Sequence, residues 1–99
     1  MKNFLFLILF FLIKIYSFAY DVKIGGIYYL LKSDFAIVTN GDNKYEGNIN
    51  IPDSIEYEGH EYEVRSIGDF AFKNCSQLKS VTIPNSVTNI GEQAFSICI

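Results

Sequence analysis

The sequence has few of the side chains that most often carry catalysis. Its one histidine, His60, falls where a hairpin tip is expected, and a histidine at such a place is usually a polar turn residue. The only two cysteines have no base near them in the sequence, so a Cys–His nucleophile is not indicated. We therefore expect no enzyme activity, no catalytic or cofactor-binding residue, no resident metal and no small-molecule substrate.

Positive charge is also scarce. Eight lysines and arginines stand against 11 acidic residues, which gives a formal net charge of −3 without any basic stripe. Proteins that bind nucleic acid or anionic lipid surfaces usually present clustered lysine and arginine. Neither kind of partner is expected.

The chain has no apolar run long enough to cross a membrane. The ten apolar residues from Phe4 to Ile13 would form a helix of about 15 Å, against a hydrocarbon core of about 30 Å. A basic start precedes this run, and Ser17 and Ala19 supply small residues before Tyr20, the layout of a cleavable signal peptide over residues 1–19. An uncleaved anchor, extended past Lys14, is the alternative.

Removal of residues 1–19 would leave one small acidic domain, residues 20–99, at the cell surface or outside the cell. The removed segment contains two bases, Lys2 and Lys14, and no acid, so the net charge would change from −3 to −5. A lipid-anchored start is not indicated, because no cysteine follows the expected cleavage point.

An internal repeat is the clearest pattern in the sequence. Six residues recur with a period of 23: Val64, Ile67, Gly68, Ala71, Phe72 and Cys75 return as Val87, Ile90, Gly91, Ala94, Phe95 and Cys98. A fixed period in the twenties is typical of a solenoid, in which each coil buries its apolar face against its neighbours.

Each repeat has two halves with different periods. The alternation from Leu78 to Ile83, closed by Pro84, predicts a short strand. The other half has apolar residues at helical spacing and two helix-start signals, and the glycines at its start leave room for the adjacent coil. The residues are Ile67, Ala71 and Cys75, repeated by Ile90, Ala94 and Cys98, with the start signals Ser66/Asp69 and Asn89/Glu92 and the glycines Gly68 and Gly91. The pattern predicts an α/β solenoid, in which each coil is a short strand plus a short helical turn.

A nine-residue insertion interrupts the period, since the pairs Ile51-Pro52 and Ile83-Pro84 lie farther apart than one repeat by that amount. It is expected to form a hairpin whose turn is Gly59-His60, so that Tyr57 faces Tyr62. The opposite face would then carry two pairs of acids, Glu56 with Glu63 and Glu58 with Glu61. Like charges across a hairpin cost stability, so this face is either well solvated or neutralised, for example by calcium.

The segment before the repeats has the pattern of strands. Alternating apolar residues predict strands over Ile27–Leu31 and Phe35–Thr39, and Gly25-Gly26 marks a turn before them. We expect residues 20–47 to form an N-terminal β-hairpin cap and residues 48–99 to form the solenoid, with about two repeats.

Cys75 and Cys98 occupy matching positions one repeat apart. Adjacent coils stack about 4.8 Å apart, a separation that permits a disulfide. Both cysteines also follow inward-facing residues at regular spacing, as small buried hydrophobes do. Free thiols and a bridge both remain open from the sequence.

Residues 81–95 (VTIPNSVTNIGEQAF) and the twofold motif Ile-Gly-x-x-Ala-Phe-x-x-Cys resemble the repeat of BspA-like leucine-rich-repeat proteins. The resemblance covers about residues 48–99. It implies an exported or surface-exposed protein, often of a bacterium or microbial eukaryote, that binds host or matrix proteins or other cells. It implies no enzyme activity and no cofactor. Family members normally carry many repeats, so a chain that stops at Ile99 is expected to be part of a longer protein.

On such a solenoid the outward strand positions line the concave face. Here they are Asn50, Ser80 and Thr82, whose small neutral side chains suit contact with a protein or a glycan. These three residues are the candidate partner contacts, although ordinary solvated strand positions would look the same. The alternative function is a non-binding cap or spacer segment of a larger surface protein or secreted enzyme.

Overall fold

The computed structural model describes residues 20–98, and within that range it contains strands and turns but no helix. The expected signal peptide, residues 1–19, lies outside the described residues. The strands are β1 (Val22–Ile24), β2 (Ile27–Leu31), β3 (Phe35–Thr39), β4 (Gly47–Asn50), β5 (Ser54–Tyr57), β6 (His60–Ile67), β7 (Leu78–Thr82) and β8 (Asn89–Ile90).

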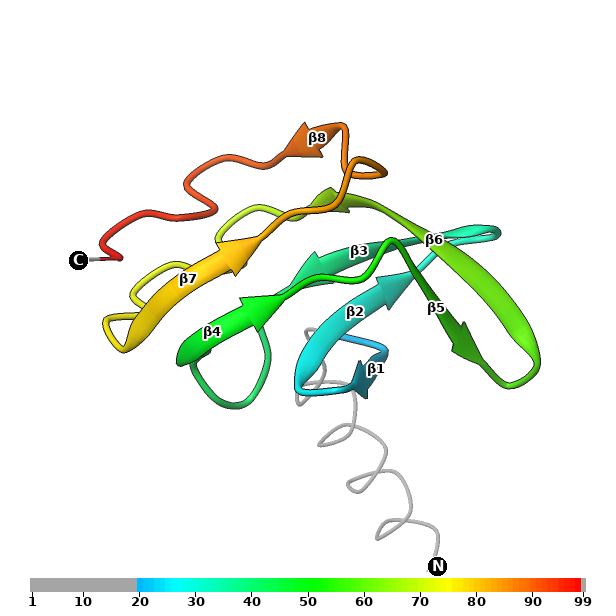
Figure 1. Ribbon diagram of the computed structural model, residues 1–99, viewed down its shortest axis with the longest axis horizontal. Coiled ribbons are helices and arrows are strands. Elements are labelled where there is room, and N and C mark those ends of the chain that lie inside the picture. Colours follow the sequence, from blue (N-terminus) through cyan, green and yellow to red (C-terminus); the bar gives the residue numbers. More distant parts are fainter. Residues whose placement is uncertain (1–19, 99) are drawn as a thin grey trace, which may run out of the picture.

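The strands form two sheets that wind as a solenoid (Figure 1). One sheet has the order β1-β2-β3-β6-β5, with β8 added to β6, and the other pairs β4 with β7. The pairs β3–β6, β6–β8 and β4–β7 are parallel. Parallel pairing joins strands that hold the same place in successive coils. The first coil therefore contains β3 and β4, the second contains β6 and β7, and β8 begins the third.

The N-terminal strands lie where the alternation predicted them. The bounds of β2 and β3 match the expected ranges, and Gly25 and Gly26 form the preceding turn with positive φ angles of 57° and 84°. In the two-stranded sheet, β4 and β7 end shortly before Pro52 and Pro84, residues that cannot donate a hydrogen bond to a ladder.

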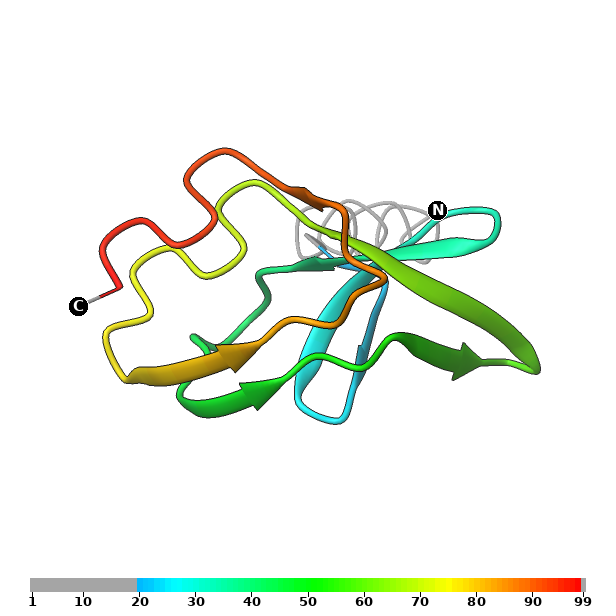
Figure 2. The same ribbon diagram turned by 45° about the horizontal axis from the view of Figure 1, so that its top comes forward.

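The expected α/β solenoid with helical turns is wrong. Figure 2 shows that the segments after β6 and β8 follow the same wave side by side, and neither is helical. Left-handed residues break each segment every four positions, at Phe70 and Asn74 and again at Gln93 and Ile97. Every second backbone amide after Phe70 donates its hydrogen bond to a carbonyl of the next coil, whereas a helix would bond within the segment. Phe72 N–H, for example, donates to the Ala94 carbonyl at 2.7 Å.

The predicted helix-start residues have other roles. Ser66 lies in β6 and Asn89 in β8, where they are register partners. The Asp69 carboxylate accepts a hydrogen bond of 2.7 Å from the Glu92 amide, so it joins two coils. The predicted helix starts are therefore wrong: Ser66 and Asn89 are strand residues, and the hydrogen bond of Asp69 joins two coils.

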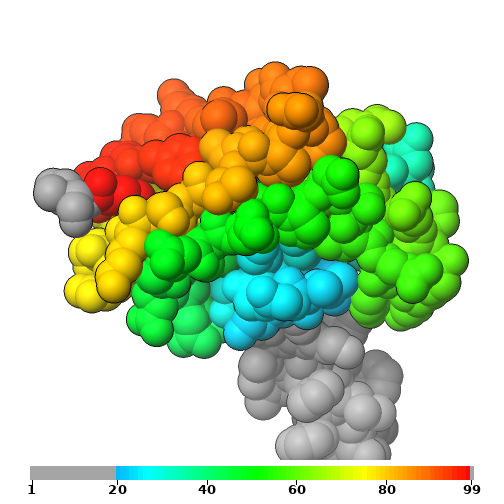
Figure 3. All heavy atoms as spheres, viewed as in Figure 1, coloured from blue at the N-terminus to red at the C-terminus, as the bar shows by residue number. Residues whose placement is uncertain are grey.

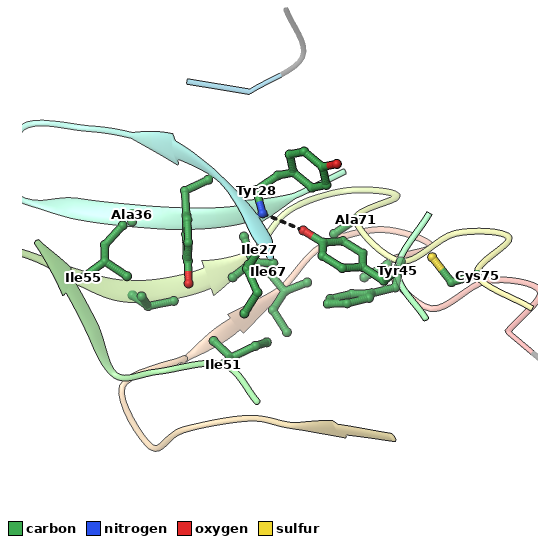
Figure 4. Close-up of a cluster of buried hydrophobic side chains, with 14 residues drawn as sticks. Ile27, Tyr28, Ala36, Tyr45, Ile51, Ile55, Ile67, Ala71 and Cys75 are labelled. Carbon is green, nitrogen blue, oxygen red and sulfur yellow. Dashed lines mark hydrogen bonds between the residues drawn. The ribbon is translucent and has the colours of Figure 1, made fainter. Parts of the chain in front are cut away.

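The core lies between the two sheets and the turn segments (Figure 4). At its centre, the Tyr45 hydroxyl accepts a hydrogen bond from the Tyr28 amide at 2.9 Å and donates one to the Thr39 carbonyl at 2.6 Å. Phe72 packs against Tyr45 and stacks on Phe95. One row of aromatic rings therefore links the N-terminal strands to the second and third coils.

The inserted hairpin forms, but its register differs from the expected one. The turn is Glu58-Gly59, both in left-handed conformation, so Tyr57 pairs with His60 and Ile55 with Tyr62. The partners shift by two residues, which preserves the faces. Glu56 now lies directly opposite Glu61, and the expected Glu56–Glu63 and Glu58–Glu61 pairs are wrong.

We expect stability to fall at alkaline pH because of buried tyrosines. Burial raises the pKa of Tyr29 to about 12, and it also raises the pKa of Tyr45. The folded state holds these protons more tightly than the unfolded state does. The contribution of these tyrosines to the free energy of unfolding should therefore be fully present below about pH 10, the usual tyrosine pKa. It should be lost as the pH rises through about 12.

Tyr29→Phe tests this expectation. The Tyr29 hydroxyl is buried and has no hydrogen-bond partner among residues 20–98, so its removal should not lower stability at neutral pH. Denaturant midpoints measured from about pH 8 to about pH 11 should decline less steeply in the variant. Equal slopes in both proteins would contradict the assignment.

Candidate interaction surface

The outward side of the β4–β7 sheet carries four exposed polar residues, Asn48, Asn50, Ser80 and Thr82, here called the β4–β7 face. Asn48 is the register partner of Ser80, and Asn50 is that of Thr82. Period-two alternation places all four on one side, with Ile49 and Val81 turned toward the core. Figure 3 shows β4 and β7 side by side on the visible surface.

The β4–β7 face offers hydrogen-bonding groups without charge. Ser80 Oγ donates to Asn48 Oδ1 at 2.8 Å, which fixes one amide. The side chains of Asn50 and Thr82 make no hydrogen bond with other groups of residues 20–98. Their amide and hydroxyl therefore remain available to a partner.

The three predicted contact residues lie together, and the sequence interpretation missed a fourth. Asn48 falls before the expected strand, and a register irregularity between Gly47 and Asn48 sets its pairing with Ser80. The sequence signal that could have identified Asn48 is its position two residues before Asn50, because residues two apart in a strand lie on the same side of the sheet. A contact role for these residues remains a proposal, which is developed below.

The cysteines are not bonded to each other. Cys75 is buried, and this burial raises the pKa of its thiol, so the reactive thiolate is disfavoured at neutral pH. The Cys98 thiol donates to the Phe72 carbonyl at 2.7 Å. Both groups therefore serve packing between coils in this structure.

His60 stands at the hairpin tip, exposed, with its ring 4.5 Å from that of Tyr62. Among residues 20–98, no three histidine, cysteine or acidic side chains are placed so that they could hold a metal ion. The acidic pair Glu56–Glu61 therefore gives no support to a calcium site.

Within the described part of the chain, no helix has the length and apolar character that a membrane span requires.

Stacked coils with parallel strands and a sequence repeat of fixed period define the chain as a solenoid repeat protein. Residues 47–99 match the family model described as BspA type leucine-rich repeat region (6 copies), and the chain belongs to this family. The resemblance noted in the sequence is confirmed, with strands and turns in place of the helical turns we expected.

Solved structures support the same fold. A leucine-rich repeat protein from Bacteroides ovatus is 33% identical with a TM-score of 0.74, covering 80% of this chain and 21% of that one. A leucine-rich repeat protein from Bacteroides capillosus is 33% identical with a TM-score of 0.69, covering 78% and 58%. The chain thus spans less than two thirds of either relative.

A leucine-rich cell surface protein from Faecalibacterium prausnitzii, 24% identical with a TM-score of 0.52, shares the fold over 78% of this chain and 28% of its own. A comparison with curated proteins finds no match. Leucine-rich repeat proteins typically serve as scaffolds for protein interaction, and this is the general role the family indicates.

Proposed function

We propose that this protein is an exported or cell-surface leucine-rich-repeat protein whose β4–β7 face binds protein or glycan partners on host, matrix or other cells. The free amide and hydroxyl of Asn50 and Thr82, directly paired on neighbouring coils, carry the proposal. Such groups can donate and accept hydrogen bonds to peptide groups or sugar hydroxyls at little desolvation cost.

Surface localisation rests on separate support. The pattern of residues 1–19 favours export, and one structural neighbour is described as a cell surface protein. Adhesion follows from this combination of an outside location and an open polar face. No enzyme activity forms part of the proposal, since burial of Cys75 disfavours its reactive thiolate.

Replacing Asn50 and Thr82 together with lysine tests the binding role. Both positions are exposed, so the change should alter the free energy of unfolding by less than about 1 kcal/mol, or about 0.5 kcal/mol at each site. Cells that display the protein should lose most of their attachment to a surface coated with extracellular-matrix protein or with host cells. Each lysine would fill the place of a hydrogen-bonding group with a long charged chain.

The matched control places the same two charges elsewhere on the second coil. Ser76→Lys with Gln77→Lys alters exposed residues that precede β7, and attachment should persist. Unchanged attachment in the Asn50/Thr82 variant, with normal display and folding, would move the binding site away from the β4–β7 face.

A further inference from the structure

A pocket of about 320 Å³ lies beside β4, on the side that turns away from β7. Ile49 of β4 forms one wall, Gly26 in the turn between β1 and β2 forms another (Figure 3), and the chain before β4 contributes residues 43–46. Of the described residues that line the pocket, none belongs to β7. Ile49 points toward the core, so the pocket and the outward β4–β7 face are separate features.

The edge of β4 next to this pocket has no strand partner in the described part of the chain, where β4 pairs with β7 alone. Gly47 and Ile51 donate their N–H groups to carbonyls in or next to β7, at 2.9 and 3.0 Å. Backbone groups alternate between the two edges of a strand. Asn48 and Asn50 therefore turn their N–H and C=O groups toward the open edge.

The space along this edge is free. A Cβ atom at Gly26 or at Gly47 would meet no atom beyond the adjoining residues within 4 Å, and Asn48 and Asn50 are exposed. An unpaired strand edge with room beside it can accept an extended segment from another chain, which then adds a strand to the sheet.

A strand added to β4 would direct side chains into the pocket. Residues directly opposite each other in neighbouring strands point to the same side of a sheet. A side chain opposite Ile49 would therefore point as Ile49 does, toward the pocket that Ile49 lines. In this mode of recognition, backbone pairing supplies affinity, and the pocket selects the side chain.

Two lysines at the pocket indicate which side chain it selects. Of the six bases in residues 20–98, Lys23 and Lys44 both line it. Neither forms an ion pair within that range, where the ion pairs belong to Arg65. Lys44 Nζ donates to the Lys73 carbonyl at 3.2 Å, which holds its ammonium group in place and leaves two further donors.

The charge of the pocket is opposite in sign to that of the domain. Lys23 Nζ lies 5.2 Å from the centroid of the Tyr28 ring, which also lines the pocket. Glu46 is the one acid of the lining, so the lining has a net charge of +1, whereas residues 20–98 together have six bases and 11 acids. A recess with this charge attracts a negatively charged group.

We propose that the open edge of β4 binds an extended acidic segment of a partner protein, with one carboxylate side chain in the pocket. The segment pairs with the N–H and C=O groups of Asn48 and Asn50. Its carboxylate accepts charge-assisted hydrogen bonds from the ammonium groups of Lys23 and Lys44. A basic side chain would meet two like charges there, which selects against basic segments.

The test uses the full chain labelled with nitrogen-15 and the peptide acetyl-Thr-Thr-Glu-Thr-Thr-amide. Titration should move the amide signals of Asn48 and Asn50 in a saturable way and slow their hydrogen exchange, because both N–H groups gain acceptors. The Ile49 amide, which faces β7, should exchange as before. The same peptide with glutamine in place of glutamate should bind about tenfold more weakly, the effect of losing a charge-assisted hydrogen bond.

Lys23→Gln should weaken binding of the glutamate peptide about tenfold for the same reason. Lys79→Gln is the matched control, because it removes the same charge from an exposed residue that does not line the pocket, and it should weaken binding by less than about twofold. Lys44→Gln should also weaken binding, which keeps the test decisive if Lys23→Gln disturbs the Tyr28 ring. Glu46→Gln removes the competing acid and should tighten binding.

Several results would overturn the proposal. Equal weakening by Lys23→Gln and Lys79→Gln would reduce the effect to general attraction, and unchanged Asn48 and Asn50 amides would exclude an added strand. The same shifts with sodium acetate alone would show a free-anion site, and tighter binding of dextran sulfate than of the peptide would indicate an anionic glycan. Self-association without peptide, lost in Lys23→Gln, would assign the edge to a second copy of the chain.

This test is independent of the attachment experiment on the β4–β7 face. Peptide binding is measured on the isolated chain through the β4 edge and the two pocket lysines, whereas attachment is measured on cells through Asn50 and Thr82. Failure of one proposal therefore leaves the other standing.

Discussion

Replacing Phe72 with alanine should lower the free energy of unfolding by about 3–5 kcal/mol, the usual cost of emptying a large buried aromatic site. The Phe72 side chain is 0% exposed. Its ring centroid lies 4.5 Å from that of Tyr45 and 5.0 Å from that of Phe95, with only 3° between the stacked planes. The substitution therefore removes contacts to both neighbouring coils.

A loss of this size is a large fraction of the total stability of a small domain, commonly about 5–15 kcal/mol. Denaturant unfolding followed by circular dichroism measures it. Phe70→Ala is the control, since Phe70 lies two residues away but is 38% exposed. A similar decrease in the free energy of unfolding for both variants would contradict a special role of Phe72 in holding the coils together. If Phe72→Ala does not fold, Phe72→Leu should give an intermediate decrease.

The strands could be predicted from the sequence because their signals are local. β2 and β3 follow from alternating apolar residues between turn residues, and the same alternation places Asn50 and Thr82 on the outward side of β4 and β7. Asn48 was missed because the apolar alternation starts only at Ile49, two residues after the paired part of β4 begins at Gly47.

The turn segments could not be predicted in this way. Apolar residues at Ile67, Ala71 and Cys75 fit one face of a helix, but they fit equally well a chain that turns every four residues. Hydrogen bonds between neighbouring coils, such as Asn74 N–H to the Ser96 carbonyl at 2.9 Å, decide between the two. Such contacts leave no periodic signal within a single repeat.

The hairpin register shows a similar limit. Gly59 suits either central position of a two-residue turn, since glycine tolerates positive φ at both. The observed turn also places Glu58 at a φ of 51°, a conformation that glutamate seldom adopts. Sequence preference alone therefore favoured Gly59-His60, and the pairing of Ile55 with Tyr62 beside the core fixed the other register.

Replacing Gly91 with alanine should cost about 1–3 kcal/mol, because the backbone of the preceding coil leaves no room there for a Cβ atom. A Cβ on Gly91 would lie 2.5 Å from the Asp69 nitrogen and 2.7 Å from the Gly68 carbonyl carbon. These are backbone atoms, so the coils themselves must separate. Separation also weakens the hydrogen bond from Gly91 N–H to the Ile67 carbonyl, now 2.7 Å.

Gly68→Ala provides the matched comparison at the same repeat position, one coil earlier. Its Cβ would lie 3.2 Å from the Val38 carbonyl oxygen and 3.3 Å from Ile37 Cγ2, contacts that small movements can relieve. Alanine also restricts the unfolded chain, which offsets about 0.4–1 kcal/mol of strain. Gly68→Ala should therefore be nearly neutral in denaturant unfolding, although its coil lies between two others. If Gly68→Ala proved the more damaging change, central position in the stack, and not the approach of the backbones, would determine which glycine the fold requires.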